Sequence, residues 1–176
     1  MTEQPPHIVV IIASVREGRI GPVVADWFLG RVGASADFEV LDVARLPDPD
    51  TAETLSRADG FVVVTPEYNH SYPGHLKVLI DDHGPQWRHK PVMFVSYGGV
   101  SGGLRAVEHL RAVFAELSAV GTRNGVVLHG PWDRIVDGRL VLDEATADSA
   151  RLAMDELLWW AGVLTPARGA ADRGVA

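Results

Sequence analysis

The strongest constraint on the fold of this chain is a run of apolar, largely β-branched residues that stops abruptly before a proline. Phe61–Val64 has the composition of a strand buried on both faces of a parallel sheet. Pro66 and the pair Pro73-Gly74 then bound a polar loop rich in Glu, Tyr, Asn, His and Ser. In an open α/β sheet such a loop lies at the carboxyl end of a strand, where ligands bind. The alternative is a surface loop whose tyrosines cover a helix end.

Other segments of the chain alternate between strand and helix patterns. Further strands are expected at Ile8–Ile12, Phe38–Val43, Pro91–Tyr97 and Gly125–Leu128. Helical patterns separate them, at Pro22–Gly33, Thr51–Ala58, Tyr72–Asp82 and Leu104–Val120, and a last helix follows Asp143. This alternation predicts one α/β domain over residues 7–165, a doubly wound five-stranded parallel sheet with helices on both faces. The pair Asp137-Gly138 predicts a small hairpin before the last helix.

Both ends of the chain lack a regular pattern. Residues 1–6 are acidic and proline-rich and are expected to be a disordered N-terminal segment, and residues 166–176 are expected to be a flexible C-terminal tail. The apolar run that follows residue 6 is too short for export or for spanning a membrane. We therefore expect a cytoplasmic protein without a membrane partner.

Charge and cysteine content exclude several classes of function. The chain has 16 Lys and Arg against 23 Asp and Glu, a net charge of −7, and no basic cluster, which argues against a nucleic-acid partner. It has no cysteine, so any redox chemistry requires a bound cofactor. None of its seven histidines has the spacing of a metal ligand set, and no metal is expected.

The turn after the first predicted strand has the features of a phosphate site. Ser14, Arg16 and Arg19 precede a helix, and Ile20 and Gly21 complete the turn. A hydroxyl, forked cations and free backbone N–H groups at a helix start suit a phosphate monoester. Neither G-x-G-x-x-G nor a P-loop is present, which disfavours a pyrophosphate or triphosphate. A solvent-exposed loop whose arginines pair with Asp26 or Glu17 is the alternative.

The turn after the fourth strand is rich in glycine. Tyr97–Gly103 contains four glycines in seven residues, so its backbone amides can approach a ligand closely, and a flexible glycine loop without function is the alternative. Together with Tyr68 and Asn69 in the loop after Pro66, three turns meet at one edge of the sheet. They suit a planar, phosphorylated heteroaromatic ligand, and flavin mononucleotide (FMN) fits this description.

Three motifs in matching order carry a resemblance to a known family. Ser14-x-Arg16-x-x-Arg19, the run from Pro66-Glu67-Tyr68-Asn69 to Lys77, and Tyr97-Gly98-Gly99-x-Ser101-Gly102-Gly103 resemble the NADPH-dependent FMN reductases of the flavodoxin-like fold. The resemblance implies a sheet ordered 2-1-3-4-5 and a homodimer or homotetramer. It also implies an FMN site made of Ser14, Arg16, Arg19, Ile20, Gly21, Pro66, Glu67, Tyr68, Asn69, Tyr97, Gly98, Gly99, Ser101 and Gly102.

The resemblance implies an enzyme that transfers a hydride from NADPH or NADH to FMN and on to a flavin, quinone or azo-type acceptor. No side chain is expected to act as a catalytic acid, base or nucleophile, because the cofactor carries the chemistry. Two other classes remain open, a non-enzymatic flavodoxin-like electron carrier and an FMN-binding redox-sensing module. One of Trp159 and Trp160, with Trp27 or Trp132, is expected to cover an oligomer interface.

Overall fold

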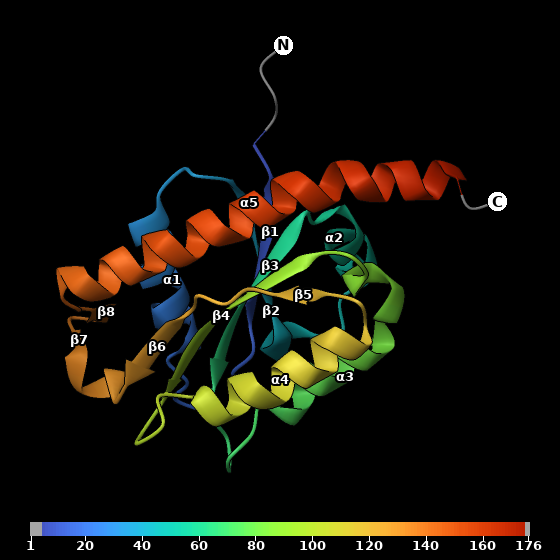
Figure 1. Cartoon of the computed structure of the whole chain (residues 1–176). Helices are drawn as coiled ribbons and strands as arrows, with labels where there is room; N and C mark the ends of the chain where they lie inside the picture. Colours follow the sequence, from blue (N-terminus) through green and yellow to red (C-terminus); the bar gives the residue numbers. More distant parts are fainter. Residues whose placement is uncertain (1–4, 175–176) are drawn as a thin grey trace.

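The computed structural model describes residues 5–174, and a parallel sheet forms its centre (Figure 1). The strands lie in the order β2 (Asp37–Asp42), β1 (His7–Ile12), β3 (Gly60–Pro66), β4 (Pro91–Gly98) and β5 (Val120–Gly121), and β6 (Val126–His129) also pairs with β4. The predicted flavodoxin-like α/β architecture and strand order are confirmed.

The fifth strand position differs from the prediction because two short strands fill it. β5 pairs with Pro91 and Val92, and β6 pairs with β4 from Val95 onward. Between them the chain leaves the ladder, and Glu156 accepts hydrogen bonds from the backbone N–H groups of residues 123 and 124, both at 2.8 Å. The backbone N–H groups in this interruption are therefore hydrogen-bonded to Glu156 in place of a neighbouring strand.

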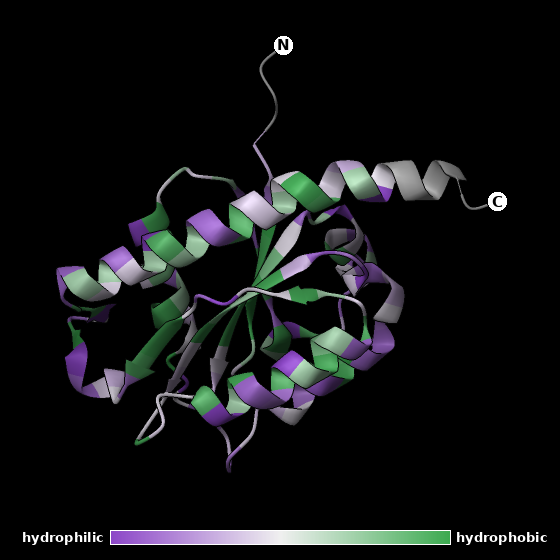
Figure 2. Ribbon diagram, in the orientation of Figure 1, coloured by the Kyte–Doolittle hydropathy of each residue, from purple (hydrophilic) through white to green (hydrophobic). Residues whose placement is uncertain are grey.

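Within residues 5–174, five α-helices cover the two faces of the sheet. Helices α1 (Gly21–Val32) and α5 (Glu144–Gly174) pack on one face, and α2 (Thr51–Arg57), α3 (Gly74–Asp82) and α4 (Leu104–Glu116) pack on the other. Every residue of β3 and β4 is buried, which explains their continuous apolar sequences. Figure 2 shows the same division, with hydrophobic residues along the central strands and hydrophilic ones on outward helix surfaces.

Shorter elements complete the fold. The 3₁₀ turns are η1 (Val43–Arg45), η2 (Gly84–Trp87) and η3 (Pro131–Arg134). The predicted hairpin is present as β7 (Ile135–Val136) and β8 (Arg139–Leu140), and positive φ angles at Asp137 and Gly138 form its turn. No helix in the described part of the chain is both long and apolar enough to cross a membrane.

The C-terminal segment differs from the prediction of a flexible tail beginning at residue 166. α5 continues past Pro166 to Gly174, and residues 175–176 lie outside the described range. Side chains on either side of the proline attach this helix to the sheet, since Thr165 donates to Asp59 (2.9 Å) and Arg168 donates to Asp59 and to the carbonyl of His89 (both 3.2 Å). Of the predicted disordered segment 1–6, residues 1–4 also lie outside that range.

Candidate functional site

The three predicted turns line one pocket at the carboxyl edge of the sheet, which is the lower edge in Figure 1. The pocket has a volume of about 420 Å³. Its walls are Arg16 to Ile20 after β1, Pro66 to Tyr68 after β3, Tyr97 to Gly99 after β4, and Trp132 after β6. Segments more than 80 residues apart in sequence therefore share one cavity, as the order of the strands requires.

Next to this pocket lie two buried hydroxyls without partners. Ser14 Oγ and Tyr97 Oη are both buried, and neither has a hydrogen-bond partner within residues 5–174. Both lie against Gly21, where a Cβ would overlap the Ser14 hydroxyl and come within 3.1 Å of Tyr97 Oη. Only glycine therefore allows α1 to begin this close to them. Buried polar atoms without partners are costly, and a bound ligand would satisfy them.

The start of α1 also suits an anion. Its N-cap residue, Ile20, makes no side-chain cap, and its first turn contains no acidic residue. Its first N–H groups and the positive end of its dipole are therefore not neutralised by a side chain. Together with the Ser14 and Tyr97 hydroxyls, this donor set fits the phosphate of FMN.

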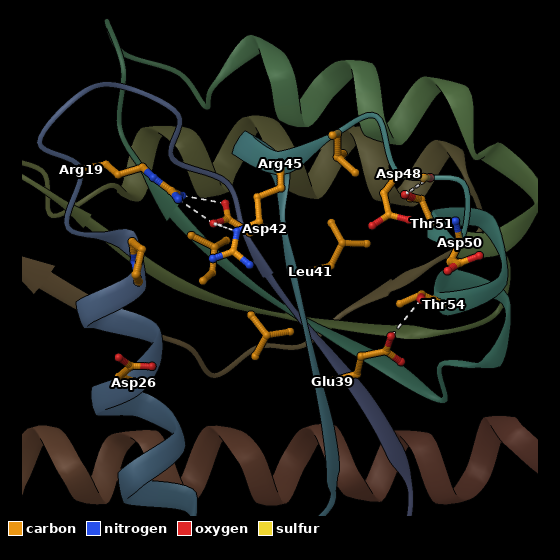
Figure 3. Close-up of a pocket in the computed structure, with 14 residues that line it drawn as sticks. Arg19, Asp26, Glu39, Leu41, Asp42, Arg45, Asp48, Asp50, Thr51 and Thr54 are labelled. Atoms are coloured by element: carbon orange, nitrogen blue, oxygen red, sulfur yellow. Dashed lines mark hydrogen bonds and ion pairs between the residues drawn. The ribbon is translucent and has the colours of Figure 1, made fainter.

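Arg19 lines the pocket, but its guanidinium is paired within the protein. It donates to both carboxylate oxygens of Asp42 (2.6 Å each) and to the carbonyl of Ser14 (2.9 Å), as Figure 3 shows for the pair with Asp42. Its partner is Asp42 and not Asp26 or Glu17. The hydrogen bonds that Arg19 donates to Asp42 raise the pKa of Arg19. Burial opposes ionisation of Asp42, but Arg19 outweighs it and holds the Asp42 pKa below its usual value.

A larger pocket of about 490 Å³ lies on the other side of this ion pair, along β2 (Figure 3). Its lining includes five acidic side chains but only two arginines, Arg19 and Arg45. The excess of negative charge makes this pocket unsuitable for a phosphate. The smaller pocket is therefore the better candidate site.

Tyr68 enters the candidate pocket from a tight hairpin. The Tyr68 backbone N–H donates to Ser71 O (2.8 Å), and the Ser71 N–H donates back to Tyr68 O (3.1 Å). Asn69 and His70 form the turn with φ angles of 49° and 68°. Asn69 is exposed at the turn and does not line the pocket, so the structure does not bring it to the predicted site.

Arg16 and Tyr68 are in direct contact. The Arg16 guanidinium carbon lies 3.8 Å from the centre of the Tyr68 ring, and the Arg16 backbone N–H lies 3.4 Å from Tyr68 Oη. This is a cation–π arrangement. It places the exposed arginine of the phosphate turn directly beside the aromatic loop.

Glu67 connects the aromatic loop to the glycine loop. Ser101 Oγ donates to one of its carboxylate oxygens, and Arg105 donates to both through its backbone N–H (3.3 Å) and its guanidinium (2.8 Å). Burial opposes ionisation of Glu67, but these donors hold its pKa below the usual value. Ser101 and Gly102 therefore shape the glycine loop and do not line the pocket, whereas Gly98 and Gly99 do.

Trp132 is the site residue that the motifs missed. Its side chain is 49% exposed and lines the pocket from η3. Gly130 N donates to Gly98 O (2.8 Å), which ties this turn to the glycine loop. The one sequence feature that could have indicated Trp132 is its position shortly after the last parallel strand.

Trp27, which was named beside Trp132 as a candidate for an oligomer interface, is only 6% exposed and packs in the core. That expectation is therefore wrong for Trp27.

No group of three or more histidine, aspartate or glutamate side chains within the described residues is arranged to hold a metal ion.

The fold and the pocket together define a class, the flavodoxin-like α/β proteins that bind a mononucleotide at the carboxyl edge of the sheet.

The family model for NADPH-dependent FMN reductase matches residues 6–133, and the chain belongs to this family. The chain is 35% identical over 165 residues to an NAD(P)H-dependent FMN reductase of Schizosaccharomyces pombe, covering 80% of each chain. It is 32% identical over 170 residues to a quinone reductase of Escherichia coli K12, covering 81% of this chain and 88% of that protein.

A solved structure with the same fold is that of the flavoenzyme NAD(P)H:(acceptor) oxidoreductase FerB from Paracoccus denitrificans. The TM-score is 0.73 at 21% identity, and the match covers 90% of this chain and 98% of that one.

Proposed function

We propose that this protein binds FMN in the pocket at the carboxyl edge and catalyses electron transfer from NADPH or NADH to a quinone or another small acceptor. The observation that carries this proposal is the shared pocket itself. Arg16, Tyr68 and Gly99, from three separate turns, line one cavity of about 420 Å³. Family membership and the names of the relatives support the same activity.

The phosphate of FMN would be held at the start of α1. Ser14 supplies a buried hydroxyl without a protein partner, and Arg16 supplies an exposed guanidinium. Arg19 acts indirectly in this proposal, because its hydrogen bond to Ser14 O fixes the turn and its charge is balanced by Asp42. Burial raises the pKa of Tyr97 well above its ordinary value, so the phenol stays protonated and can donate a hydrogen bond.

The flavin ring would lie between the aromatic loop and the glycine loop. Tyr68 offers a ring face, and Gly98 and Gly99 line the pocket without side chains of their own. Trp132 adds a second aromatic surface at the exposed side of the pocket. When bound, FMN supplies the chemistry that accepts a hydride and passes electrons on. The protein would bind and orient the reactants, and we assign no side chain as acid, base or nucleophile.

We also propose that the protein forms a homodimer or homotetramer and works in the cytoplasm, where its reduced nicotinamide co-substrates are found. Exposed apolar residues beside the pocket support self-association, since Val100 is 94% exposed and Leu104 is 47% exposed. The molar mass in solution, measured by light scattering, tests the oligomeric state, and a monomer would contradict this part of the proposal.

Anaerobic mixing with NADPH tests the proposed activity. Protein loaded with FMN is expected to lose its flavin absorbance on addition of NADPH and to regain it when a benzoquinone is added. FMN-loaded protein that NADPH and NADH both fail to reduce would instead indicate an electron carrier. Protein that cycles slowly with every acceptor would indicate a redox-sensing module.

A further inference from the structure

Helix α4 contacts the Tyr68 hairpin at two points. The Arg105 guanidinium lies 2.8 Å from Glu67 Oε1, and His109 Nδ1 lies 2.9 Å from Ser71 Oγ. Arg105 and His109 are four residues apart on α4 and therefore lie on one face of the helix, one turn apart. Their partners, Glu67 and Ser71, are the residues immediately before Tyr68 and immediately after the turn. The helix thus holds the hairpin on both sides of the ring.

The hairpin requires external restraint. Two consecutive residues that are not glycine, Asn69 and His70, have positive φ angles, which is an unfavourable backbone conformation for such residues. The hairpin contains a single bridge, between Tyr68 and Ser71, and so short a pair of strands is not stable alone. Contacts from outside the loop must therefore maintain the turn.

The two members of the Glu67–Arg105 pair differ in burial. The Glu67 side chain is 9% exposed, whereas that of Arg105 is 44% exposed. A buried carboxylate that loses its cationic partner is strongly disfavoured in place. Loss of Arg105 should therefore displace Glu67 toward solvent, and Tyr68 is the next residue along the chain.

Helix α4 also begins at the other wall of the pocket. Its N-cap is Gly103, the last residue of the glycine loop, with a φ of 90°. A Cβ there would lie 2.8 Å from both Tyr97 N and Ser96 Cβ, so the start of the helix is packed directly on β4. The helix that holds the hairpin is consequently fixed to the glycine loop.

We infer that Arg105 and His109 are positioning residues, which act through Glu67 and Ser71 to hold the Tyr68 ring at a fixed distance from the glycine loop. The importance of this distance for FMN rests on the proposed function, whereas the restraint on Tyr68 does not. Neither residue lines the pocket, so both act without touching a ligand in it.

Tyrosine NMR tests the restraint without FMN. The chain has three tyrosines, so protein labelled with 3-fluorotyrosine gives three ¹⁹F resonances, and Tyr68→Phe assigns one of them. The test variants are Arg105→Gln, His109→Leu and their combination. Arg105→Lys and His109→Asn retain a donor and are the conservative controls. Arg151→Gln removes an exposed ion pair on α5 and is the matched control.

In the double variant the Tyr68 resonance is expected to shift or broaden while the buried Tyr97 resonance stays in place. The dissociation constant for FMN is expected to rise about tenfold, and the conservative variants should recover most of this loss. Circular dichroism establishes that each variant is folded, and Arg151→Gln should match the wild type throughout.

An unchanged Tyr68 resonance in the folded double variant would overturn the inference, whatever happens to FMN. If the double variant is unfolded, the single variants Arg105→Gln and His109→Leu decide, and a Tyr68 resonance at its wild-type position and width in both of them, when folded, would also overturn the inference. A wild-type protein that binds no FMN but whose Tyr68 resonance responds to Arg105→Gln would contradict the proposed function and leave the inference standing.

Discussion

The amino and carboxyl edges of the sheet differ in how their polar side chains are hydrogen-bonded. At the amino edge, Asp59 accepts hydrogen bonds from His7 N (3.0 Å), Thr165 (2.9 Å) and Arg168 (3.2 Å). At the carboxyl edge, Ser14 and Tyr97 keep buried hydroxyls without partners inside residues 5–174. The side chains around Asp59 therefore have partners within the chain, whereas the hydroxyls of Ser14 and Tyr97 are left beside a cavity.

This difference suggests that polar groups at the amino edge stabilise the fold, whereas those at the carboxyl edge serve ligand binding. Lys90 at the amino edge donates to the carbonyls of Leu55 and Ser56 at the end of α2 (2.7 and 2.8 Å), so even a buried cation there has partners. The carboxyl edge instead contains the buried hydroxyls of Ser14 and Tyr97 and a half-exposed Trp132. Groups that destabilise the folded protein are typical of functional sites.

Removal of Asp59 should have the largest effect on stability. Asp59→Ala leaves Thr165 and Arg168 without their shared acceptor, so the free energy of unfolding should fall by about 2–3 kcal/mol. Chemical denaturation measures this change, and FMN affinity should stay within twofold. Asp37→Ala, at the same edge but with a side chain 66% exposed, should change stability little. Equal losses in both variants would remove the distinction between the edges on which this prediction depends.

Arg16→Ala should produce the reverse pattern. The exposed guanidinium makes no contribution to the core, so the unfolding transition should stay where it is. FMN affinity should fall roughly tenfold to a hundredfold through loss of a charge-assisted phosphate contact. Fluorescence titration with FMN measures the affinity, with Arg151→Ala as control. Unchanged affinity would move the phosphate away from this turn.

Two glycines of α1 provide a matched pair. In Gly21→Ala the new methyl group overlaps the Ser14 hydroxyl, and FMN affinity should fall about tenfold. Gly30→Ala, nine residues further along the same helix, meets no atom within 4 Å and should raise stability by about 0.5–1 kcal/mol without affecting FMN. Titration and thermal unfolding of both variants check the pair. If Gly21→Ala binds FMN normally, the Ser14 hydroxyl does not face the phosphate.

We expect Lys90, at the amino edge, to make the stability of the protein depend slightly on pH. Burial, with a further contribution from Arg168, lowers its pKa from 10.5 to about 8. The unfolded chain therefore binds more protons than the folded one between these values, and stability rises with pH, by about 1 kcal/mol from pH 7 to 9. Denaturation at several pH values should show this rise in the wild type and lose it in Lys90→Met. Lys77→Met, which changes the only other lysine, should keep the rise.

The architecture and the convergence of the three turns could be predicted from the sequence because both follow from local patterns. Buried parallel strands have continuous apolar runs, and strand order then fixes which turns meet. Arg16, Tyr68, Gly98 and Gly99, which line the pocket, and Ser14, whose hydroxyl is buried without a partner, were all candidates that this reasoning named.

The remaining features depend on partners that are distant in sequence. Arg19 pairs with Asp42, 23 residues away, and Glu67 pairs with Arg105, 38 residues away. Pro166 led to the prediction that regular structure ends there. The helix instead continues past Pro166, and hydrogen bonds from Thr165 and Arg168 to Asp59 hold it in place. Trp132 lies in no recognisable motif, so only the assembled edge shows its position.

The most direct measurement is the visible absorption spectrum of the purified protein after incubation with FMN, removal of free flavin, and anaerobic addition of NADPH. Flavin bands that remain with the protein and disappear on addition of NADPH are the predicted result. A spectrum without flavin bands, in a protein whose circular dichroism shows it to be folded, would contradict the assignment of the carboxyl-edge pocket as an FMN site.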